Sequence, residues 1–194
     1  MDHAPLSAEA YFHVRAGISI IFGLSLTHLL RGIVRMVQHP ELKPAYPVHV
    51  AWVASSFLLV VHFWWWEINV VTITHWTFAP YLFLISYSCL FYFLCVLLFP
   101  DHPGPHTDYR AYFHAERKWI FGVLALISAA GVIDSSLKGT SHLATLGVEY
   151  LVSTVIYLGL CLAAMFTANE RFHRGFVAAN LVYQLSWMFR MYDF

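Results

Sequence analysis

Six long apolar runs, separated by short polar links, dominate this sequence of 194 residues. A helix needs about 20 predominantly apolar residues to cross the hydrocarbon core of a bilayer, and each run has roughly that length. The runs do not alternate polar and apolar residues, as the strands of a membrane barrel would. We therefore predict six transmembrane helices, over about residues 16–37, 48–68, 79–99, 118–137, 145–167 and 175–192.

The composition agrees with a membrane protein and excludes several other classes. Hydrophobic residues make up 59% of the chain and charged residues 11%, and the eleven basic and eleven acidic side chains cancel. A disordered chain needs low hydrophobicity and high net charge, and a nucleic-acid-binding surface needs an excess of basic residues. The sequence thus predicts an all-α, polytopic membrane protein, in which residues 1–194 form a single six-helix domain surrounded by the lipid bilayer.

The distribution of basic residues predicts the orientation. Cytoplasmic loops are enriched in Lys and Arg. Three basic residues lie on the side of the two termini, namely Arg15, Lys138 and Arg190. The other eight lie toward the first, third and fifth links: Arg31, Arg35, Lys43, Arg110, Arg117, Lys118, Arg171 and Arg174. We therefore expect a bacterial-type inner (plasma) membrane, with both termini outside the cytoplasm.

Two short matches relate the halves of the chain. The tripeptide at residues 11–13 recurs at 112–114, and that at 21–23 recurs at 120–122. With three predicted spans in each half, these matches would fit an inverted 3+3 repeat, as in many transporters. Aromatic-rich membrane sequences also produce such tripeptides by coincidence. Both interpretations stay open.

Polar residues inside the predicted spans are the first candidates for function, because an ionisable group in hydrocarbon is costly and usually faces protein or water. They recur at the three- and four-residue spacing of one helical face. Together they predict a polar seam or pathway inside the bundle. The alternative is interhelical hydrogen bonding, which contributes about 0.6 kcal/mol per bond. The seam consists of Ser25, His28, His62, Glu67, Glu149, Ser153, Tyr157, Asn180 and Gln184.

A second group of candidates lies where the predicted helices meet the outer boundary. Its members are Arg15, Glu67, Asp134, Glu149 and Arg190. Unpaired charges at the edge of the hydrocarbon would be costly. We therefore expect each of the two arginines to approach at least one of the three acids, forming an outer charge cluster that closes or lines a mouth. The alternative is that all five point at water and lipid headgroups.

The twelve histidines suggest a haem b site as an alternative. His28 and His62 would be the ligands, but their predicted depths differ by roughly 10 Å, so we predict no haem. The segment 101–108, with His114 and Glu116, gathers further ligand types. It lacks the cysteines or helical His-x-x-x-His frame of a zinc site, and we predict no metal. No catalytic residue can be assigned, since the chain has no phosphate loop, dinucleotide fingerprint or nucleophile elbow.

These observations favour a small, non-enzymatic membrane protein that conducts or translocates a small ion or solute through the seam. We expect a homo-oligomer, because six helices leave little room for a wide internal pathway. Two alternatives remain open. One is an electron carrier that binds haem or quinone through histidines and aromatic residues. The other is an accessory or assembly subunit, whose polar residues pair with a membrane-protein partner. No nucleic-acid partner is expected.

Overall fold

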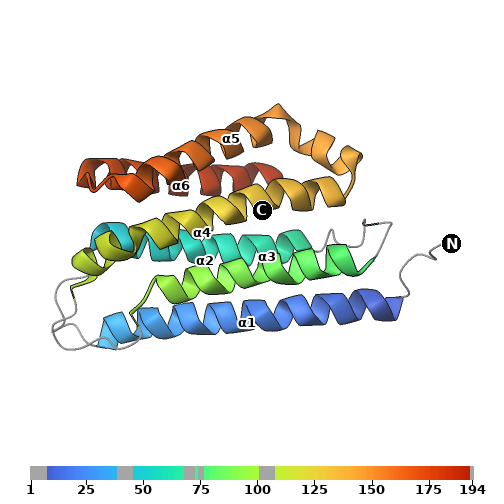
Figure 1. The fold of residues 1–194 in the computed structure, drawn as a ribbon, viewed down its shortest axis with the longest axis horizontal. Helices are drawn as coiled ribbons and strands as arrows, with labels where there is room; N and C mark the ends of the chain where they lie inside the picture. The colour runs from blue at the N-terminus through green and yellow to red at the C-terminus, as the bar shows by residue number, and fades with distance from the viewer. Residues whose placement is uncertain (1–7, 39–45, 68–72, 74–76, 101–107, 193–194) are drawn as a thin grey trace.

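The computed structural model describes residues 8–38, 46–67, 73, 77–100 and 108–192, and this part of the chain is all-helical. Consecutive helices run antiparallel along one bundle (Figure 1). Their bounds are α1 (Ala8–Gln38), α2 (Pro47–Trp66), α3 (Phe78–Leu97), α4 (Tyr109–Leu137), α5 (Thr140–Phe166) and α6 (Glu170–Met191).

Five of these helices are long and apolar enough to cross a membrane, and the prediction of a multi-pass helical membrane protein is supported to that extent. Each of the six helices overlaps one predicted run, but α6 is not among the five. Its polar residues, from Glu170 to Arg190, dilute its apolar character. The sixth span and the inverted repeat therefore stay predictions. The five candidate spans are Tyr11–Gln38, Pro47–Trp66, Phe78–Leu97, Tyr109–Leu137 and Ala144–Phe166.

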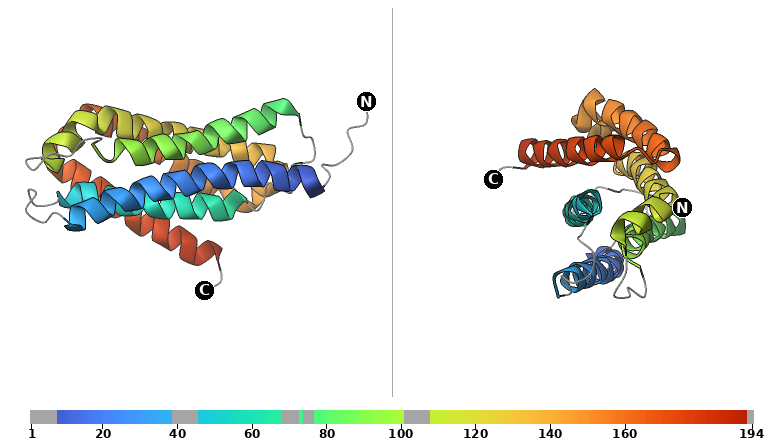
Figure 2. Two further views of the ribbon diagram at one scale, coloured as in Figure 1. Left: turned by 90° about the horizontal axis from the view of Figure 1, so that it is seen from below. Right: turned by 90° about the vertical axis from the view of Figure 1, so that its left-hand side faces the viewer.

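The helices do not pack as a simple ring. α1 packs against α3, α3 against α4, and α4 against α5, whereas α2 contacts α1 on one side and α6 on the other. Near its C-terminal end α6 diverges from the other helices (Figure 2). The contacts of α6 are therefore mainly with α2.

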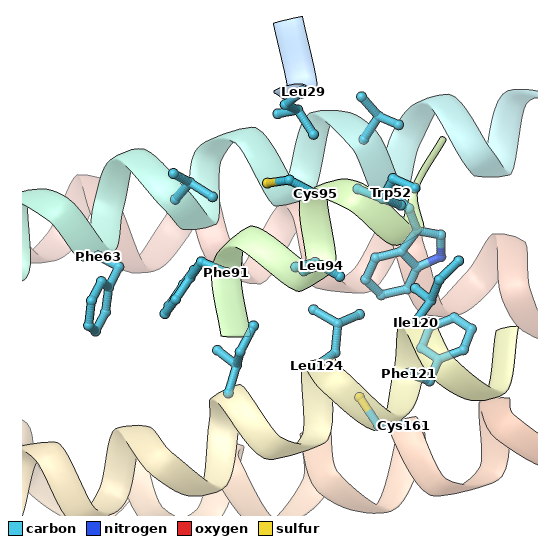
Figure 3. Close-up of a cluster of buried hydrophobic side chains, with 14 of the residues drawn as sticks. Leu29, Trp52, Phe63, Phe91, Leu94, Cys95, Ile120, Phe121, Leu124 and Cys161 are labelled. Atoms are coloured by element: carbon cyan, nitrogen blue, oxygen red, sulfur yellow. The ribbon is translucent and has the colours of Figure 1, made fainter. Parts of the chain in front are cut away.

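Aromatic side chains form much of the core (Figure 3). Trp52 on α2 is fully buried, and its ring meets Phe121 of α4 and Phe176 of α6 edge-on, each with centroids 5.1 Å apart. Nearer the other end of α2, Phe63 stacks on Phe91 of α3 with centroids 4.4 Å apart. Helix association in a bilayer relies on close packing of this kind, because lipid tails are as apolar as the core.

Local signals set the helix ends and one kink. Pro47 begins α2, where its missing N–H costs nothing. The Asp108 carboxylate caps α4 by accepting hydrogen bonds from the backbone N–H groups of Arg110 and Ala111. Gly139, with φ 110°, separates α4 from α5. Gly147 has φ 69° and ψ −179°, a conformation open essentially to glycine alone, and it bends α5 near its start (Figure 1).

Candidate functional site: an intramembrane cavity beside a buried ion triad

A cavity of about 450 Å³ lies among α2, α3, α4, α5 and α6. Its walls are mainly aromatic and aliphatic, with contributions from Phe63, Phe91, Leu124 and Tyr157. Polar atoms enter it from Ser55, His62, Asp134, Asn180 and Gln184. A concave, mostly apolar space with a few polar groups is the usual form of a small-molecule site.

Ser55 is the centre of a polar contact between α2 and α6. The Asn180 amide Nδ2 donates to Ser55 Oγ at 2.7 Å, and Ser55 Oγ donates to Gln184 Oε1 at 3.1 Å. Gln184 Nε2 in turn donates to the Ser55 backbone carbonyl at 3.3 Å. Asn180 and Gln184 are four residues apart and therefore share a helical face. These bonds hold α6 against α2 along one wall of the cavity.

The opposite wall brings tyrosine hydroxyls close to α4. Ser135 Oγ donates to the Tyr150 hydroxyl at 3.3 Å. A Cβ atom at Gly131 would lie 3.1 Å from the Tyr87 hydroxyl and 3.3 Å from that of Tyr150. The absence of a side chain at Gly131 thus lets α3 and α5 present both hydroxyls one turn before Asp134.

A buried ion triad lies at the end of the bundle where α2 and α4 end. Lys138 Nζ lies 2.8 Å from Glu67 Oε1 and 2.7 Å from Asp134 Oδ2. All three side chains are almost fully enclosed, with 0%, 2% and 1% of their surface exposed. The ammonium also lies 5.8 Å from the centre of the Trp66 ring. Lys138 therefore joins the ends of α2 and α4 in a place that water barely reaches.

The triad contains two acids and one base, so it carries a net charge of −1 when every member is ionised. The pKa of Glu67 is raised to about 7, because burial and the nearby Asp134 carboxylate raise it by more than Lys138 lowers it. Glu67 Oε2 is buried without a hydrogen-bond partner among the described residues. An uncompensated charge at such a place is costly, and binding one proton removes it.

No family model, curated protein or solved structure matches this chain. Functional assignment therefore rests on the cavity and the triad.

The structure brings five of the predicted seam residues to one place. His62, Ser153, Tyr157, Asn180 and Gln184 all line the cavity. They come from α2, α5 and α6, which shows that these three polar faces converge.

The remaining seam residues lie elsewhere. Ser25 Oγ donates to the Ile21 backbone carbonyl, one turn earlier on α1. His28 packs edge-on against Tyr92, and neither Ser25 nor His28 lines the cavity. Glu67 belongs to the triad, and the exposed Glu149 pairs with Arg190.

The predicted outer charge cluster divides into two separate contacts. Arg190 donates to Glu149 through Nη1 and Nη2, at 2.9 and 2.6 Å. Glu67 and Asp134 are paired with Lys138 instead of an arginine. Arg190 thus meets the expectation for its pair.

Arg15 does not meet that expectation. Its guanidinium donates to the Tyr11 hydroxyl at 3.3 Å, and it forms no ion pair with any of the three acids among the residues described. The physical reason is twofold: Glu67 and Asp134 are buried and paired with Lys138, and α1 lies on the side of the bundle away from α5, which carries Glu149 (Figure 2). The prediction that both arginines join one cluster is wrong at Arg15.

Sequence reasoning missed Lys138. It placed this residue at the same end of the bundle as Glu67 and Asp134 but outside the cluster. The spacing between Asp134 and Lys138 could have indicated the contact. Residues four apart on a helix are neighbours on its surface, and α4 extends to Leu137, immediately before Lys138.

The two candidate haem ligands have different surroundings. His62 lines the cavity and packs edge-on against Trp66 and Tyr192, whereas His28 lies against Tyr92. Among the described residues, no group of three metal-ligand side chains is close enough to hold an ion. Most of the ligand-rich segment 101–108 lies outside the described residues.

Further histidines gather at the opposite end of the bundle. His49 is fully buried, stacks on Tyr109 and bonds the Leu98 carbonyl through Nε2 at 2.6 Å. His173 bonds the Thr167 carbonyl at 2.9 Å, and its ring lies 5.7 Å from that of His114. These contacts tie helix ends together through backbone carbonyls, and we interpret them as structural.

Proposed function

We propose that this chain is a multi-pass membrane protein that binds a small, largely apolar solute in the cavity and translocates it across the bilayer. The observation that carries the proposal is the partly open cavity of about 450 Å³ that five helices line. Ordinary helix packing in a membrane leaves little space of that size.

The proposal includes α6 as a sixth span. Its 22 residues extend about 33 Å at the usual helical rise, which matches the thickness of the hydrocarbon core. Its polar residues Asn180 and Gln184 bond to Ser55 on α2, whereas Val182 and Phe189 are 69% and 65% exposed. A helix with this distribution places its polar face inside the bundle and its apolar face in lipid.

A solute fits the cavity better than a hydrated ion. Ion pathways replace the hydration shell with rings of carbonyl or charged groups. Here the cavity has no such ring among its described residues, and Phe63, Phe91, Leu124 and Phe176 contribute to its largely apolar walls. Such walls favour a molecule with apolar surface of its own.

The outer face of α5 supports burial in the membrane. Val148, Val155 and Phe166 are 75%, 69% and 75% exposed, and we place them in lipid. The expected homo-oligomer would cover part of this face with a second copy of the chain. Measuring the protein mass in detergent would test that expectation.

We also propose that the triad end of the bundle faces outside and the α5–α6 link faces the cytoplasm of an inner membrane. The basic residues Arg171 and Arg174 follow that link, as cytoplasmic segments prefer. In a background without the three native cysteines, Ala168→Cys should be protected from an impermeant reagent added outside. Ser136→Cys should react. The opposite pattern would reverse the orientation.

The translocation proposal is tested by filling the cavity. Ser128 on α4 lines it, and Ser136, two turns later on the same helix, is exposed. We expect proteoliposomes with the unaltered protein or Ser136→Trp to take up apolar solutes from a panel, and those with Ser128→Trp to lose that uptake. Equal uptake by both variants, or none above protein-free vesicles with the unaltered protein, would overturn the proposal.

A further inference from the structure

The member of the triad that reaches the cavity is an acid. Asp134 lines the cavity, whereas Glu67 and Lys138 do not. Lys138 Nζ is held between two carboxylate oxygens and its side chain is 0% exposed. The triad group nearest a bound solute at this end would therefore be the Asp134 carboxylate, which is 1% exposed behind the cavity wall, and the ammonium would be shielded beyond it.

The walls around Asp134 also suit a positive charge. Trp66, Tyr87, Tyr150 and Trp187 line the same cavity, and the faces of aromatic rings attract cations, with Trp the strongest. The 5.8 Å approach of Lys138 to the Trp66 ring is one such contact already present in the protein. Aromatic rings with a carboxylate among them are the usual surroundings of a bound organic cation.

We propose that the solute is a monovalent lipophilic cation, bound at the Asp134 end of the cavity in exchange for one proton held by Glu67 and Asp134. This inference rests on the proposed translocation function and names its substrate class.

The charges balance in this exchange. Without solute, the Lys138 ammonium and one bound proton neutralise the two carboxylates. When the cation enters, that proton leaves the carboxyl oxygen for water, and the solute takes over its charge. No covalent bond other than O–H is broken or formed, and no oxidant or reductant is needed.

The groups around Glu67 are consistent with one exchangeable proton. Lys138 and Asp134 face it from α4, and the Tyr87 and Tyr150 side chains of α3 and α5 are close enough to interact electrostatically with the triad. Among these groups Lys138 is the only cation. The raised pKa of Glu67, about 7, lies where a proton is both held and released near neutral pH.

Binding of two isosteric probes tests the inference. Tetraphenylphosphonium and tetraphenylborate have the same shape and opposite charge. With purified full-length protein in neutral detergent, we expect the phosphonium to bind at least about tenfold more tightly than the borate. Binding at about pH 6, below the Glu67 pKa of about 7, should release close to one proton per cation into weakly buffered solution.

Variants connect the binding to the triad. Asp134→Asn and Glu67→Gln each remove the exchangeable proton and the net negative charge. We expect each to weaken phosphonium binding about tenfold or more and to abolish proton release. Glu149→Gln is the matched control, because Glu149 is exposed and outside the cavity, and it should do neither. If Asp134→Asn does not fold, Glu67→Gln carries the test.

The outcomes separate the two proposals. Equal binding of both probes, blocked by Ser128→Trp, would refute the cation and leave a cavity that takes apolar solutes. Cation binding without proton release, or unchanged in Glu67→Gln, would refute the exchange. Binding of neither probe would overturn the inference, while solute uptake in vesicles would decide the translocation proposal independently.

Discussion

Lys138 Nζ lies 2.8 Å from Glu67 Oε1, although 71 residues separate the two in the chain. The contact joins the end of α4 to the end of α2 beside the cavity. Neither residue has an alternative partner in water, since both are almost fully buried. The ends of these two helices are therefore fixed relative to each other by a pair that is costly to break.

Removing the Lys138 ammonium should strongly destabilise the bundle. Lys138→Met would leave two buried carboxylates without their cation, and breaking a buried ion pair from one side typically costs about 3–5 kcal/mol. We expect a clearly lower midpoint of thermal unfolding in detergent.

The control for this variant is on the same helix. Lys118 on α4 is exposed, and Lys118→Met should leave the midpoint nearly unchanged. Equal effects of the two substitutions would show that the triad does not hold the helix ends together.

The pH dependence of stability should reveal the shared proton. The folded-state pKa of Glu67 is raised to about 7, above its ordinary value, so its contribution to folding is largest at low pH. That contribution is lost as the pH rises from about 4.5 through about 7. Glu67→Gln is neutral at every pH and avoids this loss.

We therefore subtract the unfolding midpoint of the unaltered protein from that of Glu67→Gln. This difference should become more positive between pH 5.5 and 8.5. Both proteins contain the same histidines, so the subtraction removes the effect of histidine titration on the midpoint. A difference that stays constant, or that shifts in favour of the unaltered protein, would contradict a proton on Glu67.

Much of the fold could be read from the sequence because one physical rule governs it. A span must be long, apolar and helical to satisfy its backbone in lipid, so each predicted run coincides with a helix. α6 shows where the rule weakens. Asn180, Gln184 and Arg190 lower its apolar content. The contacts with Ser55 on α2 explain the first two, and the ion pair with Glu149 on α5 explains Arg190.

The site was harder to predict, because it depends on which helical faces meet. Spacing alone placed His62, Asn180 and Gln184 on faces of their helices, and they converge at the cavity. Spacing could not show that α1 packs away from α5. For this reason the sequence groups Ser25 and His28 with the seam, and Arg15 with the outer charge cluster, although they do not approach those residues in the structure. The cavity itself is lined by residues of five different helices, a combination that no local pattern encodes.

The kink in α5 should depend on Gly147. A side chain there would be forced into a backbone conformation that costs about 1–3 kcal/mol. We expect Gly147→Ala to lower the unfolding midpoint, even though a Cβ atom would meet nothing within 4 Å. Gly159, also on α5 and also open to space, is the control: Gly159→Ala should be neutral or slightly stabilising. A neutral Gly147→Ala would show that the kink is absent.

The contact between α2 and α6 should be measurable as a coupling. Interhelical hydrogen bonds in membrane proteins average about 0.6 kcal/mol and reach about 1.7. A double-mutant cycle of Ser55→Ala with Asn180→Ala, followed by unfolding in detergent, should give a coupling in that range. Ser136→Ala with Asn180→Ala is the matched cycle and should give zero, because the hydrogen bond that Ser136 makes within the described part of the chain is to the Val132 carbonyl on its own helix. Strict additivity in the Ser55 cycle would mean that α6 is held by packing alone.

The most direct test of the account compares two positions on α5. Ser153 lines the cavity, and Val155, two residues later, is 69% exposed on the outer face. Single cysteines are introduced at each position, without the native cysteines, in protein embedded in a bilayer, and are treated with a water-soluble thiol reagent. The account predicts reaction of Ser153→Cys and protection of Val155→Cys, because the cavity admits water and the outer face lies in lipid. Protection of Ser153→Cys, or reaction of Val155→Cys, would contradict a solute-accessible cavity inside a membrane-embedded bundle.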